Sequence, residues 1–401
     1  MTGQETLDLP SGADPIELAT FRTWGEDHPM RTLLSPNTSR SLIACLIILV
    51  GGTSGLARAD EKTPYSQLYD EWETDVAAVK EQVPVAATQK AAIENVGQVY
   101  SRRFVDLARE QRQNEDQFFS CNLWLLVHGT PGDALDEGME LLRENADVLK
   151  SYAFNLQLAL SEAISLQSEA ANPMLRHLSK KHHSAELRGV ALYVLGVRLM
   201  REAHAQGDLE LLHEAEQILT NVIETPEYAD AHSYRGASGE KAAAALEILR
   251  GTNGLGKVAP EIESTDLDGQ PFRLSDLRGK VVVLSFSGHW CGPCREMHPY
   301  EQALVEKYAG ELFAVIEINS DQDLDKLRTN MGEKGLTWTC VPEGSSLGPI
   351  QEAWKIEAWP RFFVLDRNGI IRFIFHGAPR EELAERVAIL MDESIEATAN
   401  D

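Results

Sequence analysis

Apolar residues recur every three or four positions through most of the chain between residues 62 and 250. The clearest run of this kind is Ile93, Val96, Tyr100, Phe104 and Leu107. Such spacing places apolar side chains on one face of a helix, so we expect this region to be helical almost throughout. Breaks are expected at Gly129–Gly132 and at Thr225–Pro226, because glycine and proline interrupt helices.

One part of this region, residues 191–224, reads as a pair of antiparallel helices. The turn Gln206-Gly207-Asp208 separates them. The pair resembles a tetratricopeptide-type unit, since Gly196 and Ala215 stand near the small positions at which such helices pack closely. We find no fixed repeat length, so residues 60–250 are predicted to form an irregular array of helical hairpins. Two roles stay open for this array: protein docking or dimerisation, and a spacer with its own core.

The pattern changes after residue 250. The closely spaced glycines of residues 251–257 follow a helix and precede none, which is typical of a linker and not of a phosphate-binding loop. The order then reads strand, strand, helix, strand, helix, strand, strand, helix. Residues 281–286 and 312–318 are continuous apolar runs, as expected for strands of a sheet covered on both faces. We therefore predict an α+β multidomain chain, with the helical-hairpin region followed by an α/β unit over residues 258–401.

Residues 1–59 read as a leader and not as a folded domain. Leu42–Val50 is a nearly unbroken apolar run, preceded by arginines and followed by glycines and by Ala57-Arg58-Ala59. This order is typical of a signal peptide, so we expect export to an extracytoplasmic compartment and cleavage after Ala59. The apolar run is shorter than the roughly 20 residues that span a bilayer. A start at Met30 would give a signal peptide of ordinary length. An uncleaved membrane anchor over residues 41–57 is the alternative.

The chain is strongly acidic. Lys and Arg number 37 and Asp and Glu number 62, which gives a formal net charge of −25. Binding to nucleic acid or to an anionic lipid surface requires basic patches, so we expect neither. The charge permits basic protein partners, and it also fits a merely solubilising excess.

Two cysteines, Cys291 and Cys294, stand two residues apart between an apolar strand pattern and a helical pattern that begins at Arg295. Such a pair can form and break a small disulfide loop, and a helix N-terminus stabilises the thiolate of the first cysteine. A zinc site with this spacing needs a second pair of ligands. The sequence contains no second pair, and His298 has no partner nearby. We therefore expect no metal and interpret the pair as redox-active.

The other cysteines and the clustered histidines carry no chemistry in our interpretation. Cys121 lies in an apolar helical pattern and Cys340 in the alternating segment 337–341, so both are predicted to be core residues. A bridge between these two cysteines stays open. The histidines His177, His182 and His183 are predicted to lie in a solvated loop between helices.

Several motifs around the cysteine pair resemble the thioredoxin superfamily, and within it the extracytoplasmic TlpA/ResA-type thiol–disulfide oxidoreductases. The resemblance covers roughly residues 256–395. It rests on Trp290 before the first cysteine, on Pro299 five residues past the second, and on Trp359-Pro360 with the hairpin that follows. Further matching segments are Ala259-Pro260, residues 266–269 and residues 274–280. The resemblance implies a thioredoxin-like α/β sandwich.

The resemblance also implies a role for each residue of the cysteine motif. Cys291, at the helix N-terminus, is expected to attack the substrate disulfide, and Cys294, one turn further, to resolve the mixed disulfide. Gly292 leaves Cys291 accessible, and Pro293 fits the first helical turn. This Gly-Pro dipeptide resembles that of reducing thioredoxins and favours a reductase. Trp290 is expected to shield one side of the pair.

The segment around Pro360 is expected to complete the substrate site. Because it resembles the cis-proline loop of the family, its peptide bond is predicted to be cis and to face the disulfide. The backbone of Trp359 is then expected to pair with the substrate chain. The alternative for Trp359 is a core aromatic.

One departure from the family concerns a buried acid. Thioredoxins carry an aspartate six residues before the first cysteine, where this chain has Ser285. We predict that Glu317, on the neighbouring strand, supplies the carboxyl group instead and exchanges a proton with Cys294. The alternative is a Glu317 at a solvated strand edge. His289 is expected to be exposed.

These observations predict an exported thiol–disulfide oxidoreductase that reduces protein disulfides without a cofactor. The resemblance implies a membrane thiol donor of the cytochrome-maturation (DsbD) type as its partner. Two alternatives stay open. The first is a peroxiredoxin-type thiol peroxidase, although the Pro-x-x-x-Thr/Ser-x-x-Cys loop of that branch is absent before Cys291. The second is a helical scaffold with a redox domain used only for docking.

Overall fold

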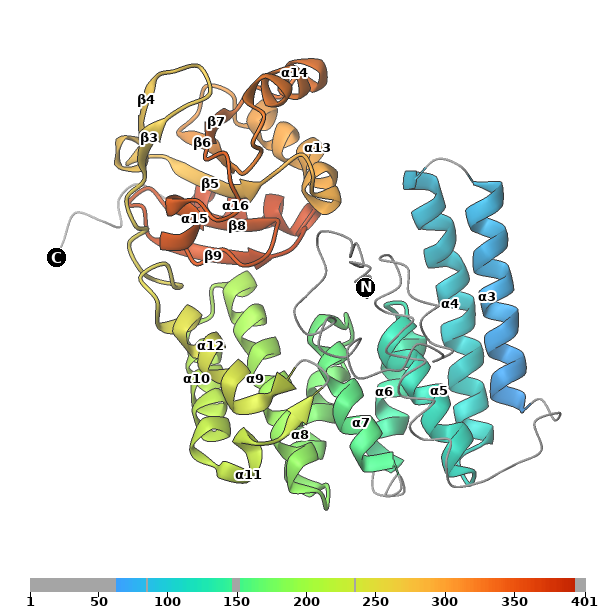
Figure 1. The fold of residues 1–401 in the computed structure, drawn as a ribbon. Coiled ribbons are helices and arrows are strands. Elements are labelled where there is room, and N and C mark those ends of the chain that lie inside the picture. The colour runs from blue at the N-terminus through green and yellow to red at the C-terminus, as the bar shows by residue number, and fades with distance from the viewer. Residues whose placement is uncertain (1–62, 84–85, 146–151, 234–235, 394–401) are drawn as a thin grey trace, which may run out of the picture.

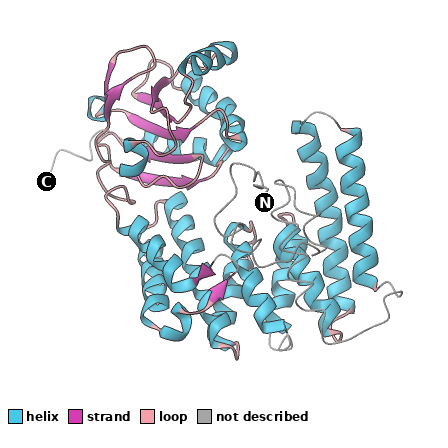
Figure 2. Cartoon of the chain, in the orientation of Figure 1, coloured by secondary structure: helices cyan, strands magenta, loops and turns pink. Residues whose placement is uncertain are grey.

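The computed structural model describes residues 63–83, 86–145, 152–233 and 236–393. Helical hairpins stand side by side in a row, and a mixed sheet with its own helices sits on the C-terminal end of that row (Figure 1). Figure 2 shows that the sheet is confined to the second part, apart from one very small hairpin within the array. The predicted order, helices first and an α/β unit second, is confirmed. The predicted leader lies outside the described residues.

The helical array extends from residue 64 to residue 250. Its α-helices are α3 (Pro64–Gln82), α4 (Ala86–Glu110), α5 (Glu115–His128), α6 (Asp133–Asn145), α7 (Ala153–Ala159), α8 (Ala171–Lys181), α9 (Ala185–Gln206), α10 (Leu209–Glu224), α11 (Pro226–Ala229) and α12 (Ser238–Arg250). A 3-10 turn (Leu160–Ser165) follows α7, and the two-residue strands β1 (His232–Ser233) and β2 (Gly236–Ala237) precede α12. Both predicted breaks fall between helices.

The predicted helix pair is α9 and α10, and local chemistry explains the turn between them. Gly207 ends α9 in the left-handed conformation, at φ 73°. The side chain of Asp208 then accepts hydrogen bonds from the backbone N–H groups of Glu210 and Leu211 and so caps α10. A Cβ atom at Gly207 would lie 2.9 Å from the carbonyl oxygen of Arg372 in the second part of the chain, so this turn also requires glycine for close approach.

The core of the array is apolar and aromatic. Phe104 and Trp124 stack with ring centroids 4.1 Å apart, and both are fully buried. Cys121 lies in the same core, where burial raises the pKa of its thiol to about 12. Cys121 and Cys340 are both free and buried. Their prediction as core residues is confirmed, and no bridge joins them.

The clustered histidines differ from the prediction. His177 lies within α8, and His182 caps the end of that helix with its side chain buried. The apolar stripe of α8 continues to its last turn, which draws His182 inward. The predicted solvated loop is therefore wrong for these two residues. Within the described ranges, no group of three His, Cys, Asp or Glu residues could hold a metal ion.

The second part is a five-stranded sheet in the order β7-β6-β5-β8-β9. The three strands β5, β6 and β7 are parallel, and β8 and β9 are antiparallel additions. The strands are β5 (Val281–Ser287), β6 (Phe313–Asn319), β7 (Thr339–Pro342), β8 (Arg361–Leu365) and β9 (Ile371–His376). The helices are α13 (Gly292–Lys307), α14 (Leu324–Lys334), α15 (Pro349–Ala353) and α16 (Glu381–Asp392), and a small hairpin, β3 (Glu263–Thr265) with β4 (Pro271–Arg273), precedes the sheet.

Strand β5 is buried at every position, as the continuous apolar run predicts. Alternate residues serve two different cores. Val281 and Val283 pack with α13, α14 and α16 on one face. Val282 and Leu284 face the other way, into an apolar cluster that continues through Trp354 to the helical array. The two parts of the chain therefore share a hydrophobic core.

Edge strand β9 packs against α9 of the array. His204 on α9 and His376 on β9 lie in parallel planes, with Nδ1 of His204 3.0 Å from Nε2 of His376. Arg386 of α16 also donates to the carbonyl oxygen of Ala205 at 2.8 Å. The predicted linker, residues 251–257, is built into this junction: the N–H of Gly256 donates to the carbonyl oxygen of Ile371.

Candidate active site

The cysteine pair lies where β5 turns into α13. Cys291 is the residue before the first helical turn, and Pro293 occupies that turn, where a missing N–H costs nothing. Cys291 and Cys294 form a disulfide with a Cα–Cα distance of 5.3 Å. The backbone N–H of Cys294 donates to Sγ of Cys291 at 3.2 Å, so the helix terminus stabilises negative charge on that sulfur.

The two cysteines differ in exposure. Cys291 is 6% exposed and Cys294 is 1% exposed. Gly292 has no side chain over the pair, and a Cβ atom added there would contact nothing within 4 Å. Cys291 is therefore the more accessible cysteine of the pair.

Two tryptophans and a proline stand beside the disulfide motif. The Trp359-Pro360 peptide bond is cis, which confirms that prediction. The ring of Trp290 meets the ring of Trp359 edge to face at 5.4 Å, so the motif and the proline loop are in contact. Trp290 is 55% exposed and offers an apolar surface next to Cys291.

Glu317 is fully buried on β6, so the solvated-edge alternative is wrong. Its register partner on β5 is Ser285, the position of the missing aspartate. Both carboxylate oxygens accept hydrogen bonds, Oε1 from Nδ2 of Asn319 and Oε2 from Nε1 of Trp338, each at 2.9 Å. The structure thus has a fixed carboxyl group in the layer between the sheet and α13.

A second buried acid, Glu301 on α13, escaped the sequence analysis. It is 2% exposed. Burial raises its pKa to about 8; the charge of Glu317 adds to the rise, and the Ser285 hydroxyl partly offsets it. The signal was present in the sequence: Glu301 stands seven residues after Cys294, on the buried face of the same helix. From sequence alone, a polar residue within an apolar stripe looks like a break in the buried face of the helix. Its burial becomes evident only when the residues packed around it are known.

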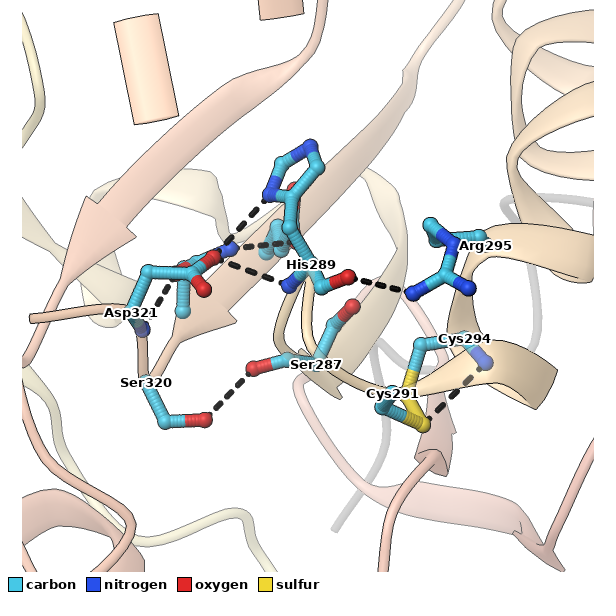
Figure 3. Close-up of a disulfide and its surroundings, with 9 residues drawn as sticks. Ser287, His289, Cys291, Cys294, Arg295, Ser320 and Asp321 are labelled. Atoms are coloured by element: carbon cyan, nitrogen blue, oxygen red, sulfur yellow. Dashed lines mark hydrogen bonds and ion pairs between the residues drawn. A yellow bond between two sulfur atoms is a disulfide. The ribbon is translucent and has the colours of Figure 1, made fainter. Parts of the chain in front are cut away.

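His289 is half-buried and its side chain is only 7% exposed, so its predicted exposure is wrong. Its Nδ1 and its backbone N–H both bond to Oδ2 of Asp321, at 3.0 and 2.9 Å. Burial opposes ionisation of Asp321, but these hydrogen bonds from His289 keep the pKa of Asp321 below its ordinary value. The ring of His289 points toward Asp321 and away from the two sulfur atoms (Figure 3). It therefore orders the loop before Cys291 without facing the disulfide.

Comparisons with known proteins find relatives of the second part of the chain. The Redoxin family profile matches residues 255–390. The thiol-disulfide oxidoreductase ResA of Geobacillus kaustophilus is 32% identical over 132 residues, which are 33% of this chain and 75% of that protein. The thioredoxin-like protein YneN of Bacillus subtilis is 28% identical over 134 residues, 33% of this chain and 76% of that protein. A putative thiol:disulfide interchange protein DsbE of Chlorobium tepidum aligns in structure at 28% identity and TM-score 0.31, covering 34% of this chain and 95% of its own.

A disulfide between a buried strand and a helix N-terminus, next to a cis-proline loop, defines a thioredoxin-like thiol–disulfide oxidoreductase. The similarity covers three quarters of ResA from Geobacillus kaustophilus. The chain belongs to the ResA-type family of thiol–disulfide oxidoreductases, with Cys291 and Cys294 as its redox pair. This assignment favours the oxidoreductase interpretation over the peroxidase and scaffold alternatives. The helical array lies outside the matched region.

Proposed function

We propose that this protein is an exported reductase of disulfides in extracytoplasmic proteins. The observation that carries the proposal is the Cys291–Cys294 disulfide at the start of α13, with Cys291 the more exposed sulfur. The Gly292-Pro293 dipeptide between the cysteines supports the reducing direction by its resemblance to reducing thioredoxins.

The proposed reaction has two exchange steps. The Cys291 thiolate attacks one sulfur of the substrate disulfide, forms a mixed disulfide and releases the first substrate thiolate. Cys294 then loses its proton and attacks Sγ of Cys291, which forms the intramolecular disulfide and releases the second thiolate. The substrate gains two electrons and the pair loses two. A membrane thiol donor of the DsbD type restores the dithiol in this proposal.

The residues around the pair receive roles in substrate binding. The backbone of Trp359, held by the cis bond to Pro360, pairs with an extended substrate segment. Trp290 covers one side of the mixed disulfide with its exposed ring. The buried carboxyl group of Glu317 takes part in the proton transfer of the second step.

Export is proposed from the leader of residues 1–59. Within the ranges that the structure describes, no helix combines the length and the apolar character that a membrane crossing requires. The mature protein is expected to begin at Asp60, and N-terminal sequencing tests this. Intact residues 41–57 in a membrane fraction would favour the anchor instead. A role of the helical array in binding a partner or a second copy also stays a proposal.

Turnover of insulin disulfides by the purified protein, with dithiothreitol as donor, tests the function. Cys291→Ser should abolish turnover because it removes the attacking thiolate. Cys121→Ala is the matched control, since Cys121 is buried in the helical array and should retain turnover. An inactive parent protein, or an active Cys291→Ser variant, would exclude the proposed reaction.

A further inference from the structure

Three side chains lie in line on the buried face of α13, starting at the disulfide. Cys294, His298 and Glu301 are separated by four and three residues, and all three are buried. Residues at these spacings are neighbours on a helix surface, with Cβ atoms about 5–6 Å apart. His298 therefore stands between the resolving sulfur and the buried carboxyl group of Glu301.

His298 is placed to move a proton. Neither ring nitrogen has a hydrogen-bond partner among the described residues. Burial lowers its pKa to about 4, and the charges of Lys334, His289 and Arg295 add to this, so the ring is neutral at neutral pH. A neutral imidazole has one N–H donor and one acceptor nitrogen. It can accept a proton at one nitrogen and release another from the opposite nitrogen.

Glu301 and Glu317 have unequal surroundings. Both oxygens of Glu317 accept hydrogen bonds, from Asn319 and Trp338. Oε1 of Glu301 has no partner among the described residues. Among the described residues, the Cys340 thiol lies beside Glu317 on the neighbouring strand, and burial and the Glu317 charge raise the pKa of that thiol well above the ordinary value. Burial and the charge of Glu317 raise the pKa of Glu301 to about 8, so Glu301 is a group that can take up a proton near neutral pH.

We propose that His298 passes the proton of Cys294 to Glu301 during the resolving step, and that Glu317 holds it there by its charge. The inference rests on the proposed function and specifies its second step. The acceptor nitrogen of His298 takes the Sγ proton of Cys294, and the other nitrogen gives its proton to Glu301 in the molecules whose Glu301 is ionised. Because the pKa of Glu301, about 8, lies close to neutral pH, such molecules are present and Glu301 can act as a general base. The Cys294 sulfur bonds to Sγ of Cys291, and the substrate thiolate leaves with the bonding electrons.

The reverse half of the cycle restores every group. When a donor thiol opens the disulfide, Cys294 leaves as a thiolate. Glu301 returns its proton through His298, and the imidazole regains its first tautomer. One proton thus moves between Cys294 and Glu301 as the pair is oxidised and reduced.

The aromatic disulfide dithiobis(nitrobenzoate) tests the proposal, because it releases one coloured thiolate in each step. Reduced full-length protein is mixed with it in a stopped-flow instrument. Glu301→Gln and His298→Gln should leave the first release unchanged and slow the second by about a hundredfold, at the lower end of general acid–base contributions. Glu306→Gln, an exposed acid-to-amide change on the same helix, is the matched control and should change neither release.

The pH dependence of the second release distinguishes a lost proton transfer from a purely structural defect in the variants. Hydroxide removes the Cys294 proton directly at high pH, so the second release of both variants should recover as the pH approaches about 10, above the ordinary thiol pKa of about 8.5. Glu317→Gln should slow the second release less than Glu301→Gln does, since it removes only a neighbouring charge.

Three outcomes would overturn the inference: a parental second release in Glu301→Gln or His298→Gln, a slow release at every pH, or a larger effect of Glu317→Gln than of Glu301→Gln. The last would make Glu317 the proton acceptor. A parent protein that makes no second release would refute the proposed function itself.

Discussion

Two clusters of buried titratable groups lie in this molecule, and they respond to protons in opposite ways. Beneath α13, Glu301 has a pKa raised to about 8, chiefly by burial. Between β9 and α9, burial lowers the pKa of His204 to about 3, with the charges of Arg361 and Arg201 adding to the effect. Both clusters disfavour the charged form. Near neutral pH Glu301 is therefore mostly protonated, with an ionised fraction that can accept a proton, and His204 is neutral.

Their places in the fold explain what each cluster does. Glu301 shares a helix face with Cys294, where a movable proton serves thiol chemistry. Nε2 of His376 lies 3.0 Å from Nδ1 of His204 and 3.2 Å from Nη1 of Arg361. Arginine can only donate, so Nε2 of His376 must be an unprotonated acceptor. Arg361 follows the cis-proline directly, and the neutral histidines thus join the helical array to the strand that begins at the active site.

The largest effect on stability is expected when the pH is lowered, because two buried rings, His204 and His376, would then take up protons. A group with a lowered folded-state pKa contributes stability above its unfolded value, here 6.5, and loses it as pH falls toward 3. The His204 shift corresponds to a loss on the order of 5 kcal/mol in the free energy of unfolding. Urea denaturation between pH 7 and pH 4 measures it. His204→Gln should flatten this dependence, and an equally steep slope in the variant would show that the cluster does not set it.

A rise in pH should destabilise the folded protein through the acid cluster, in which a single group, Glu301, is considered. A carboxyl group whose folded-state pKa is raised contributes stability below its unfolded value of 4.5 and loses it as pH rises toward 8. For this one group the loss is on the order of 5 kcal/mol, as for His204, because the two pKa shifts are equal in size. Glu301→Gln should therefore be more stable than the parent at pH 8 and gain little at pH 4.5. Thermal unfolding of both proteins at these two pH values checks the sign, and a variant less stable at pH 8 would contradict it.

Loss of the interface contact at neutral pH should have a smaller effect. His376→Leu removes the acceptor of the buried Arg361 guanidinium, and an unsatisfied charged donor costs about 2–3 kcal/mol. Because Arg361 adjoins Pro360, the KM for insulin should rise more than kcat falls. Denaturation and steady-state kinetics measure the two effects. Unchanged stability and KM would show that the junction does not position the proline loop.

The smallest effect is expected at the surface contact between the array and α13. Lys90 of α4 pairs with Glu296 of α13 at 2.8 Å, and both side chains are nearly half exposed. Such pairs contribute about 0–1 kcal/mol. Lys90→Ala should therefore leave both stability and insulin turnover close to those of the parent. A large loss of turnover would instead point to a role of α4 in substrate binding.

The sequence by itself determined the elements and the reactive pair. Periodic apolar residues predicted the helices, the continuous apolar runs predicted buried strands, and the Cys291–Cys294 spacing with Trp359-Pro360 predicted the site. These features are local, because the spacing along a chain reports which face of an element is buried. The burial of Glu317 was also predicted, from a position on a strand next to Ser285.

Only the tertiary structure decided which polar groups meet inside. Glu301 and Glu317 come from a helix and a strand that pack together, and His204 and His376 stand 172 residues apart. Periodicity gives no information on such partners, since a buried polar residue looks the same in sequence as a break in an apolar stripe. The packing of α13 on the sheet buries one such polar residue, Glu301, on the helix face that carries Cys294. The packing of β9 on α9 brings two others, His204 and His376, together at the junction between the array and the active site.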